Sequence, residues 1–311
     1  MNTTIDSNWN VEGDSEAIAR ALLVSELEEP RLERGKLIRG RYDNYTVLSP
    51  LTETTQSRLY HGRSTEGRRM VIKEYLQNYP SKAFEREGYI HNLLYYKGGH
   101  RNIIPAWEFI VDGYNPLGIF PYVEGRTLEE KLEEDGPFDQ EEVVPIISML
   151  CDVVDYIHDL NIIHRDIKAS NVMITQLVPT IIIPQLFDFG IAWHPDIAHH
   201  DTKGGYYGTI AYMAPEKWKF LPPHKREDIY SLATLFYELL SGDVPYPVNN
   251  LIELFHTHSQ RMPVPDLTED NPFISDKINE VIKKGLGYDL KQRYQTAGEM
   301  KQAYLKAVGR K

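Results

Sequence analysis

The hydrophobic pattern of this chain changes its period at Gly125, and this change constrains the fold more than any other feature. Residues 45 to 76 contain three runs rich in β-branched and aromatic side chains, separated by turn residues, which is typical of antiparallel strands. One helix is predicted over residues 81 to 96. After Gly125 the apolar residues recur every three or four positions, which indicates helices. The sequence therefore predicts an α+β protein with two lobes, a small antiparallel-β N-lobe with one helix and a larger, mainly helical C-lobe.

We divide the 311 residues into an N-terminal extension (1–41), an N-lobe (42–124) and a C-lobe (125–311). Apolar residues at helical spacing predict an amphipathic helix over residues 14 to 29, which Pro30 ends. The extension could pack on the small lobe, inhibit in cis, or contact a partner or a second copy of the chain in a homodimer.

Charge and composition exclude several classes of function. The formal net charge of −11 argues against a general nucleic-acid binder, because contact with phosphates needs concentrated lysine and arginine. No apolar run approaches the ~20 residues of a membrane-spanning helix. The polar N-terminus is not a secretory signal, and the single cysteine, Cys151, fits a reducing compartment. We therefore expect a cytoplasmic protein without a membrane span.

A polar loop stands between the long helical pattern of residues 141 to 160 and the next apolar run. This loop, "HRDIKASN", contains Asp166, Lys168 and Asn171, and further on Asp188 leaves an apolar strand just before a glycine. Asn171 and Asp188 offer the oxygen ligands that a hard ion such as Mg²⁺ prefers. Asp166 could orient a hydroxyl, and Lys168 could neutralise the charge that develops on a phosphate.

A lysine on an earlier strand complements this loop. In "MVIK", Lys73 follows Val71 by two residues, so the two side chains share one face of the strand. If this strand faces the cleft between the lobes, the lysine can bind phosphates while the valine contacts a purine.

Together these stretches resemble the protein kinase family. "HRDIKASN", "DFG", "GTIAYMAPE" and "EDIYSLATLFYELLSG" occur in the family's order within residues 45 to 306. The lysine two residues after the loop aspartate and the "GTIAYMAPE" stretch are similar to serine/threonine kinases, most of all the eukaryotic-like kinases of bacteria. The resemblance implies transfer of the γ-phosphate of ATP, with Mg²⁺, to serine or threonine hydroxyls of a protein substrate, including autophosphorylation.

The resemblance assigns the catalytic roles. Asp166 would orient the substrate hydroxyl and Lys168 would approach the γ-phosphate. Lys73 would contact the α- and β-phosphates and pair with a glutamate of the predicted helix. Glu87 is the preferred partner, because apolar residues follow it at core spacing, and Glu85 is the alternative.

The resemblance also implies contacts with the metal, the nucleotide and a regulatory phosphate. Asn171 and Asp188 would hold Mg²⁺, and Phe120 would be the gatekeeper. Arg165 would bind a phosphate on the activation segment, for which Thr202 is the preferred site. The remaining nucleotide contacts are Leu51, Thr52, Thr54, Ser57, Leu59, Val71, Pro121, Val123 and Met173. The implied structural contacts are an ion pair of Glu216 with Arg293, Asp228 bracing the catalytic loop, and Thr209 hydrogen-bonded to Asp166 and Lys168.

The chain departs from the family in its phosphate-binding loop. Thr52, Thr54 and Ser57 stand at the three glycine positions, and Glu53 adds a negative charge. Because glycine allows backbone N–H groups to approach phosphates closely, we expect a weaker or less mobile lid, with hydroxyls that could donate to phosphate oxygens. An active kinase with a modified lid is the favoured interpretation, and a pseudokinase scaffold with impaired nucleotide binding is the alternative. His91, one turn after Glu87, is either a pH-sensitive element or a core histidine.

Overall fold

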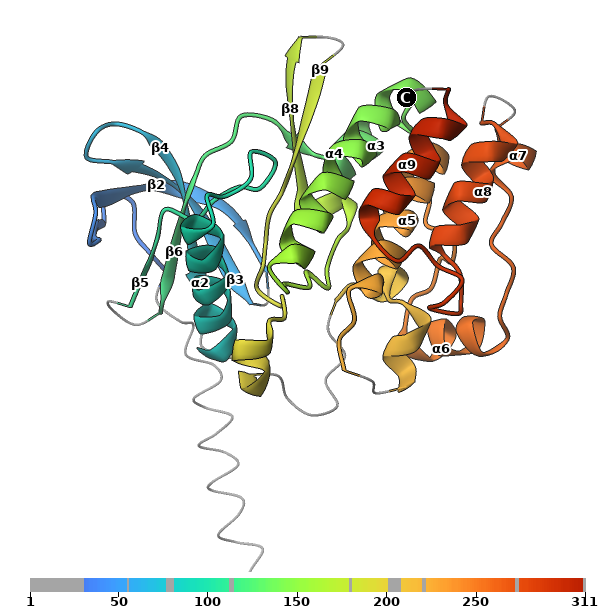
Figure 1. Ribbon diagram of the computed structural model, residues 1–311. Helices are drawn as coiled ribbons and strands as arrows, with labels where there is room; N and C mark the ends of the chain where they lie inside the picture. Colours follow the sequence, from blue (N-terminus) through green and yellow to red (C-terminus); the bar gives the residue numbers. More distant parts are fainter. Residues whose placement is uncertain are drawn as a thin grey trace, which may run out of the picture.

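The computed structural model describes residues 31–54, 56–76, 81–111, 115–178, 181–200, 208–219, 222–271 and 274–309. These residues form two lobes side by side, a sheet with one helix and a bundle of helices (Figure 1). This arrangement confirms the predicted α+β architecture. The helix predicted over residues 14 to 29 and the predicted phosphosite Thr202 lie outside the described residues.

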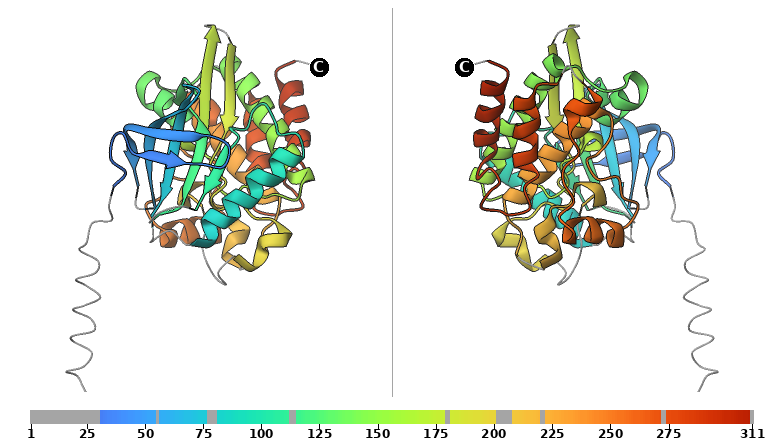
Figure 2. Two further views of the ribbon diagram at one scale, coloured as in Figure 1. Left: turned by 90° about the vertical axis from the view of Figure 1, so that its left-hand side faces the viewer. Right: turned by 90° about the vertical axis from the view of Figure 1, so that its right-hand side faces the viewer.

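The small lobe is built on an antiparallel sheet with the strand order β1-β2-β3-β4-β6-β5, and helix α2 lies beside the sheet in two perpendicular views (Figures 1 and 2). The elements are β1 (Leu37–Arg39), β2 (Asn44–Glu53), β3 (Ser57–Ser64), β4 (Arg69–Tyr75), α2 (Ser81–Tyr96), β5 (Glu108–Ile110) and β6 (Leu117–Pro121). Strand β1 was not predicted. It lies within the predicted extension and pairs with β2, so the sheet begins before residue 42.

Burial alternates along β4, and this alternation separates the two faces of the sheet. Ile72 and Glu74 are buried, whereas Val71 and Lys73, which alternate with them along the strand, are half-buried. On the first face Ile72 joins a core of apolar side chains that includes Tyr45 and Ile119, against which Leu32 packs. The second face carries Val71 and Lys73, as the spacing of two residues predicted.

The large lobe contains a small sheet of strand order β7-β8-β9 and most of the helices. The strands and α-helices are β7 (Arg126–Thr127), α3 (Leu128–Asp135), α4 (Gln140–Asp159), β8 (Val172–Val178), β9 (Ile181–Leu186), α5 (Arg226–Ser241), α6 (Leu251–Ser259), α7 (Leu267–Asp270), α8 (Asp276–Gly285) and α9 (Ala297–Ala307). Four 3-10 turns are η1 (Ala169–Asn171), η2 (Pro195–His200), η3 (Ile210–Tyr212) and η4 (Pro215–Lys219). The β8–β9 hairpin projects beyond both lobes in Figure 1.

Helix α5 forms the centre of the large lobe. It is buried at nearly every position, in agreement with an apolar pattern that runs around the whole helix. Helix α4 packs against α5, α9 and β9, so the apolar stripe predicted along residues 141 to 160 faces this core. Gly242 ends α5 in the left-handed conformation at φ 89°, the conformation that glycine adopts at the end of a helix without steric cost.

A buried ion pair joins the turn η4 to the segment before α9. Arg293 Nη1 and Nη2 donate to the two carboxylate oxygens of Glu216 at 2.8 and 3.0 Å. The Arg293 side chain is 0% exposed and that of Glu216 is 5% exposed. The guanidinium also donates to the carbonyl oxygens of Gly287 and Arg226, so its donors are used on several sides. This bidentate pair fixes the end of the segment that follows Asp188 in the chain.

We predict that Arg293→Met lowers the free energy of unfolding by about 3–5 kcal/mol, because it leaves the Glu216 carboxylate buried without its counter-ion. The matched control is Lys301→Met, which breaks the more exposed pair with Asp152 (side chains 22% and 51% exposed) and should cost at most about 1 kcal/mol. Urea unfolding of both variants measures the difference. Equal losses would show that the buried pair contributes no more than a surface pair.

Candidate active site

Two consecutive elements of the small lobe and a segment more distant in the sequence meet at the ammonium group of Lys73. This lysine of β4 places its Nζ 3.0 Å from Glu87 Oε2 on α2 and 2.9 Å from Asp188 Oδ1, which follows β9. The Glu87 side chain is 0% exposed and that of Lys73 is 12% exposed. Of the two candidate glutamates, Glu87 forms the pair, while Glu85 is exposed on the same helix.

The electrostatics of this group keep Asp188 ionised. Burial acts to raise the pKa of Asp188, but the charge and hydrogen bond of Lys73 outweigh it and hold the pKa at about 2. Burial raises the pKa of Glu87, and the Lys73 charge opposes this rise. Asp188 has a φ of 64°, an uncommon conformation for a residue with a side chain, and Gly190 N donates to its Oδ1 at 3.3 Å.

The second group of polar side chains surrounds Asp166. Its Oδ1 accepts hydrogen bonds from the backbone N and the Oγ1 of Thr209, both at 2.9 Å. Its Oδ2 accepts from Asn171 Nδ2 at 2.9 Å and lies 3.1 Å from Lys168 Nζ. Lys168 Nζ also donates to Thr209 Oγ1 at 2.7 Å. The carboxylate is therefore held in one orientation by donors on both of its oxygens.

Asp228 of α5 holds the backbone of this loop. The Asp228 carboxylate accepts from the backbone N of His164 and of Arg165, both at 2.8 Å, and lies 2.8 Å from His158 Nε2. Arg165 has a φ of 68°, and its Nε donates to Ile191 O at 2.6 Å. These bonds hold a strained loop conformation in place, and they connect Arg165 to the segment that follows Asp188.

The sheet register brings the predicted adenine contacts toward Lys73. Leu59 pairs with Lys73 across β3 and β4, and Val71 pairs with Phe120 across β4 and β6, so these side chains share one face. All of them are half-buried. The predicted contacts Pro121, Val123 and Met173 are also half-buried, whereas Leu51 is exposed (45%) and lies at an irregularity of the β2 pairing.

The structure shows how the loop without glycine is built. Thr54 Oγ1 accepts from the backbone N of Gln56 at 3.2 Å and of Ser57 at 3.1 Å, and Thr54 N donates to Ser57 O at 2.9 Å. The threonine side chain therefore closes the turn on itself, in the manner of short hydroxyl side chains in turns. It engages backbone N–H groups of the kind that a glycine-rich loop presents to phosphates. Thr52 is exposed at the end of β2, and Ser57 is buried.

The charge of Glu53 is paired within the same hairpin. Arg58 Nε lies 2.9 Å from Glu53 Oε1, and Arg31 Nη2 lies 2.9 Å from Glu53 Oε2. The hydrogen bond from Arg58 lowers the pKa of Glu53, so the carboxylate is ionised and compensated. The negative charge expected near the phosphates is thus accompanied by two guanidinium groups.

Sequence reasoning missed the hydroxyl of Tyr75, which donates to Glu87 Oε2 at 2.7 Å. A signal was available, because Tyr75 follows Lys73 by two residues and must share its face of the strand.

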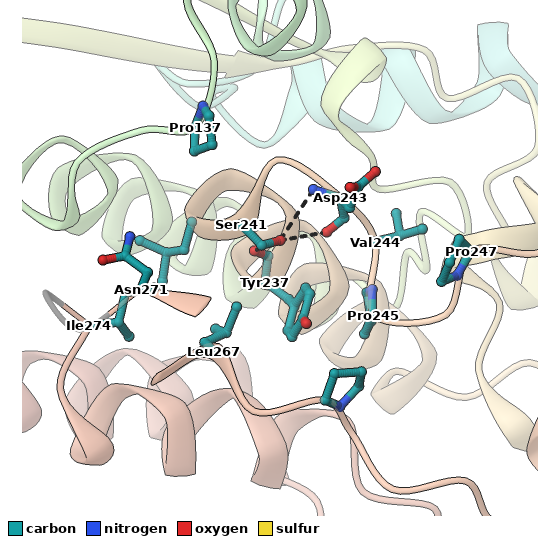
Figure 3. Close-up of a pocket in the computed structure, with 12 residues that line it drawn as sticks. Pro137, Tyr237, Ser241, Asp243, Val244, Pro245, Pro247, Leu267, Asn271 and Ile274 are labelled. Atoms are coloured by element: carbon teal, nitrogen blue, oxygen red, sulfur yellow. Dashed lines mark hydrogen bonds between the residues drawn. The ribbon is translucent and has the colours of Figure 1, made fainter. Parts of the chain in front are cut away.

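A cavity of about 480 Å³ lies elsewhere, in the large lobe beside the end of α5 (Figure 3). Four prolines contribute to its lining, and Asp243 is its one charged lining residue. None of the polar groups around Lys73 and Asp166 lines it. This cavity therefore has no part in the chemistry of the site. Its lining residues are Pro137, Tyr237, Leu240, Ser241, Asp243, Val244, Pro245, Pro247, Pro265, Leu267, Asn271 and Ile274.

Two lobes joined at a lysine–carboxylate group, next to an aspartate–lysine–asparagine loop, are the arrangement of fold and site found in the protein kinase class. The chain belongs to the protein kinase domain family, whose family model matches residues 45–305.

Curated relatives include serine/threonine-protein kinase PknB of Mycobacterium leprae, 30% identical over 187 residues, which cover 60% of this chain and 29% of the relative. The probable serine/threonine-protein kinase PknB of Lactococcus lactis is 26% identical over 268 residues, 83% of this chain and 41% of the relative. The probable serine/threonine-protein kinase CA_C1728 of Clostridium acetobutylicum is 29% identical over 201 residues, 64% of this chain and 30% of the relative. The chain thus spans well under half of the length of these relatives. None of the helices in the described part of the chain is both long and apolar enough to cross a membrane.

His91, one turn after Glu87 on α2, lies among aromatic rings. Its ring centroid is 5.3 Å from that of Phe189, 5.7 Å from that of Phe120 and 5.8 Å from that of Phe109. Its Nδ1 accepts from Ala106 N at 3.2 Å, which places the proton of the neutral ring on Nε2. Burial, assisted by the Lys73 charge, lowers the pKa of His91 to about 3. His91 is therefore a neutral core histidine near pH 7.

We predict that His91 makes the protein less stable in mild acid. Its pKa is about 3 in the folded chain and about 6.5 when unfolded, so the unfolded state binds the extra proton as the pH falls below about 6.5. Between about pH 7 and pH 5 this linkage lowers the free energy of unfolding by about 2 kcal/mol.

Urea unfolding at both pH values gives the change in the free energy of unfolding between pH 7 and pH 5. The difference between this change in the wild type and in His91→Leu is the contribution of His91. The matched control is His256→Leu, at an exposed position of α6, which should leave the pH dependence unchanged. An equal pH dependence in the wild type and His91→Leu would contradict the assignment.

Proposed function

We propose that this chain is a serine/threonine protein kinase that transfers the γ-phosphate of ATP to hydroxyl groups of protein substrates and phosphorylates itself. The observation that carries the proposal is the double ion pair of Lys73 with Glu87 and Asp188. In protein kinases the pairing of this lysine with the helix glutamate is a condition for catalysis. Membership of the protein kinase domain family and the similarity to serine/threonine kinases support the same activity.

The contacts of Thr209 support Asp166 and Lys168 as the groups that receive a substrate hydroxyl. The Thr209 Oγ1 donates to Asp166 Oδ1 at 2.9 Å and accepts from Lys168 Nζ at 2.7 Å. A hydroxyl group thus fits between this carboxylate and this ammonium. In the transfer, the substrate oxygen bonds to the γ-phosphorus while the bond from that phosphorus to the bridging oxygen of ADP breaks. Asp166 orients the hydroxyl and takes its proton, and Lys168 neutralises the charge on the transferred group.

The donor atoms near Asp188 fit a magnesium ion. Asp188 offers an ionised carboxylate with a pKa of about 2. Asn171 directs its Nδ2 at Asp166, which turns its amide oxygen away from that residue. Both are hard oxygen ligands of the type that Mg²⁺ prefers, and a bound Mg²⁺ would neutralise phosphate charge.

Nucleotide contacts are proposed from the same geometry. Lys73 would bind the α- and β-phosphates. The half-buried apolar side chains on its face of the sheet support a site for the adenine ring, with Thr52, Thr54 and Ser57 forming the lid. Leu51 is the weakest of the proposed contacts, because it is exposed. The residues proposed to contact the adenine ring are Leu51, Leu59, Val71, Pro121, Val123 and Met173.

The proposed partner is a protein with serine or threonine acceptors, in the cytoplasm. The single cysteine of the chain, Cys151, is fully buried in the large-lobe core, which supports a reducing compartment. The contacts of Arg31 with Glu53 and of Leu32 N with the Tyr60 hydroxyl (3.3 Å) support packing of the described end of the extension, residues 31–41, on the small lobe.

We predict that incubation with Mg²⁺ and ATP adds about 80 Da per phosphate to the intact mass of the wild type. Asp166→Ala should show no gain, because loss of a positioned acid–base group typically costs a factor of 10²–10⁴. The matched control is Asp159→Ala, an exposed aspartate at the end of α4, which should behave as the wild type. If the phosphatase-treated wild type neither gains mass nor phosphorylates a generic protein substrate, the proposed function is wrong.

A second prediction concerns the lid. Thr54→Gly should lower KM for ATP about fivefold with little change in kcat, because it frees the N–H groups of Gln56 and Ser57 for phosphate, and a net hydrogen bond is worth about 1 kcal/mol. The matched control is Thr65→Gly, in the turn at the opposite end of β3. Steady-state kinetics with varied ATP measures KM and kcat for both variants and the wild type. A raised KM in Thr54→Gly would mean that the closed threonine turn itself presents the lid to the nucleotide.

A further inference from the structure

Tyr75 lies on the same face of β4 as Val71 and Lys73 and is 1% exposed. Its hydroxyl donates to Glu87 Oε2 at 2.7 Å, the oxygen that also lies 3.0 Å from Lys73 Nζ. The Glu87 carboxylate is thus bound by two donors from one strand, two residues apart.

The surroundings keep the Tyr75 hydroxyl in place as a donor. Burial raises the pKa of Tyr75 well above 10, and the Glu87 charge raises it further, so the phenol stays protonated. Its ring packs edge-on against Phe84 at 5.2 Å, and Lys73 Nζ lies 4.9 Å from the ring centroid. Gly118 leaves room for the hydroxyl, because a Cβ at that position would lie 3.2 Å from it and 2.8 Å from Phe120.

Glu87 needs a second donor because the Lys73 ammonium has several partners. Its ammonium already binds Glu87 and Asp188, and it has only three N–H groups. Phosphates of a bound nucleotide would compete for the same ammonium. Glu87 is 0% exposed, so water cannot replace a bond that Lys73 gives up, and a buried carboxylate without a partner is costly.

We propose that Tyr75 is a positioning residue for phosphoryl transfer, which holds Glu87 and therefore helix α2 in place while Lys73 binds phosphate. This inference rests on the proposed kinase function. Tyr75 acts through Glu87, whose Oε2 binds both the Tyr75 hydroxyl and the Lys73 ammonium.

A pH-dependent signature distinguishes this role from simple packing. The groups that face Glu87 are Lys73 and Tyr75 from β4 and Asp188 from the segment after β9. Burial raises the pKa of Glu87, whereas the Lys73 charge and the hydrogen bonds from Tyr75 and Lys73 lower it. Removing the Tyr75 hydroxyl should therefore raise the pKa of Glu87, and the ionised Glu87 that pairs with Lys73 should be lost at a higher pH.

The test compares Tyr75→Phe with Tyr45→Phe. Tyr45 is another fully buried tyrosine of the sheet, and its hydroxyl donates to Glu108 of β5, away from Lys73. For Tyr75→Phe we expect kcat near pH 7 to fall about tenfold and the acid limb of the kcat profile to move up by about one pH unit, the size expected for a lost hydrogen bond to a charged group. Tyr45→Phe should leave the position of the acid limb unchanged, whatever it costs in thermal stability.

Amide hydrogen exchange without nucleotide gives a readout that does not need activity. Residues 81–96 of α2 should exchange faster in Tyr75→Phe than in Tyr45→Phe at equal distance below their unfolding temperatures. If Tyr75→Phe keeps the acid limb of the wild type and the same α2 exchange as Tyr45→Phe, the positioning role is wrong. An inactive wild type would instead refute the kinase function, and the exchange result would still decide whether Tyr75 holds α2.

Discussion

The buried carboxylate of Glu87 is the constraint on which the site depends. A carboxylate at 0% exposure is stable only where its oxygens are bound by donors, and here the donors come from β4 alone, through Lys73 and Tyr75. Helix α2 can therefore take one position against the sheet. Because Lys73 also binds Asp188, the same interaction sets the distance between the small lobe and the segment that follows β9. The relative placement of the two lobes and the position of the Lys73 ammonium therefore depend on the same contacts.

The large lobe provides the corresponding constraint through α5. Asp228 is fully buried and binds the backbone of His164 and Arg165, so the loop with Asp166 is attached to the centre of the helical core. Arg165 and Asp188 both have a positive φ, which costs of order 1 kcal/mol or more for a residue with a side chain. The two strained residues lie on the two loops that supply the reactive groups. Asp228 holds the first, and Lys73 contacts the side chain of the second.

The sequence allowed the layers of the fold to be predicted because burial and period agree in this chain. Alternation on β4 placed Val71 and Lys73 on one face, and the core spacing after Glu87 separated it from Glu85. The same alternation applied to Tyr75, but its partner on α2 could not be known without the packing of helix on sheet. The chemistry of their side chains suggested roles for Asp166, Asn171 and Asp188, but the resemblance to a family assigned these roles, since polar residues in a loop do not reveal what faces them.

Other features had no local signal. The short strand β1 lies in a basic segment without alternation and exists because β2 offers it an edge. The pairing of Arg58 with Glu53 depends on the register of β2 with β3, which shifts at two irregularities near Ser49 and Thr52. An irregularity of this kind moves the side chains that follow it relative to the partner strand. The pairing of the Glu53 charge therefore depends on a register that no local pattern in the sequence predicts.

The register of β2 with β3 also determines how the loop without glycine is anchored. Arg58 joins Glu53 at the tip of the hairpin to Glu74, which lies on the face of β4 opposite Lys73 and accepts hydrogen bonds from Tyr60 and Asn115. The lid is thus anchored by buried charges to the strand that carries the phosphate-binding lysine. Buried ion networks fix one arrangement more than they add stability. A glycine-rich loop approaches phosphate closely because it lacks side chains, whereas in this hairpin the Thr54 hydroxyl already binds the N–H groups of Gln56 and Ser57. Under the proposed function, phosphate affinity would then depend mainly on Lys73 and on a metal that Asn171 and Asp188 would hold, and the position of Lys73 depends on its pairing with Glu87.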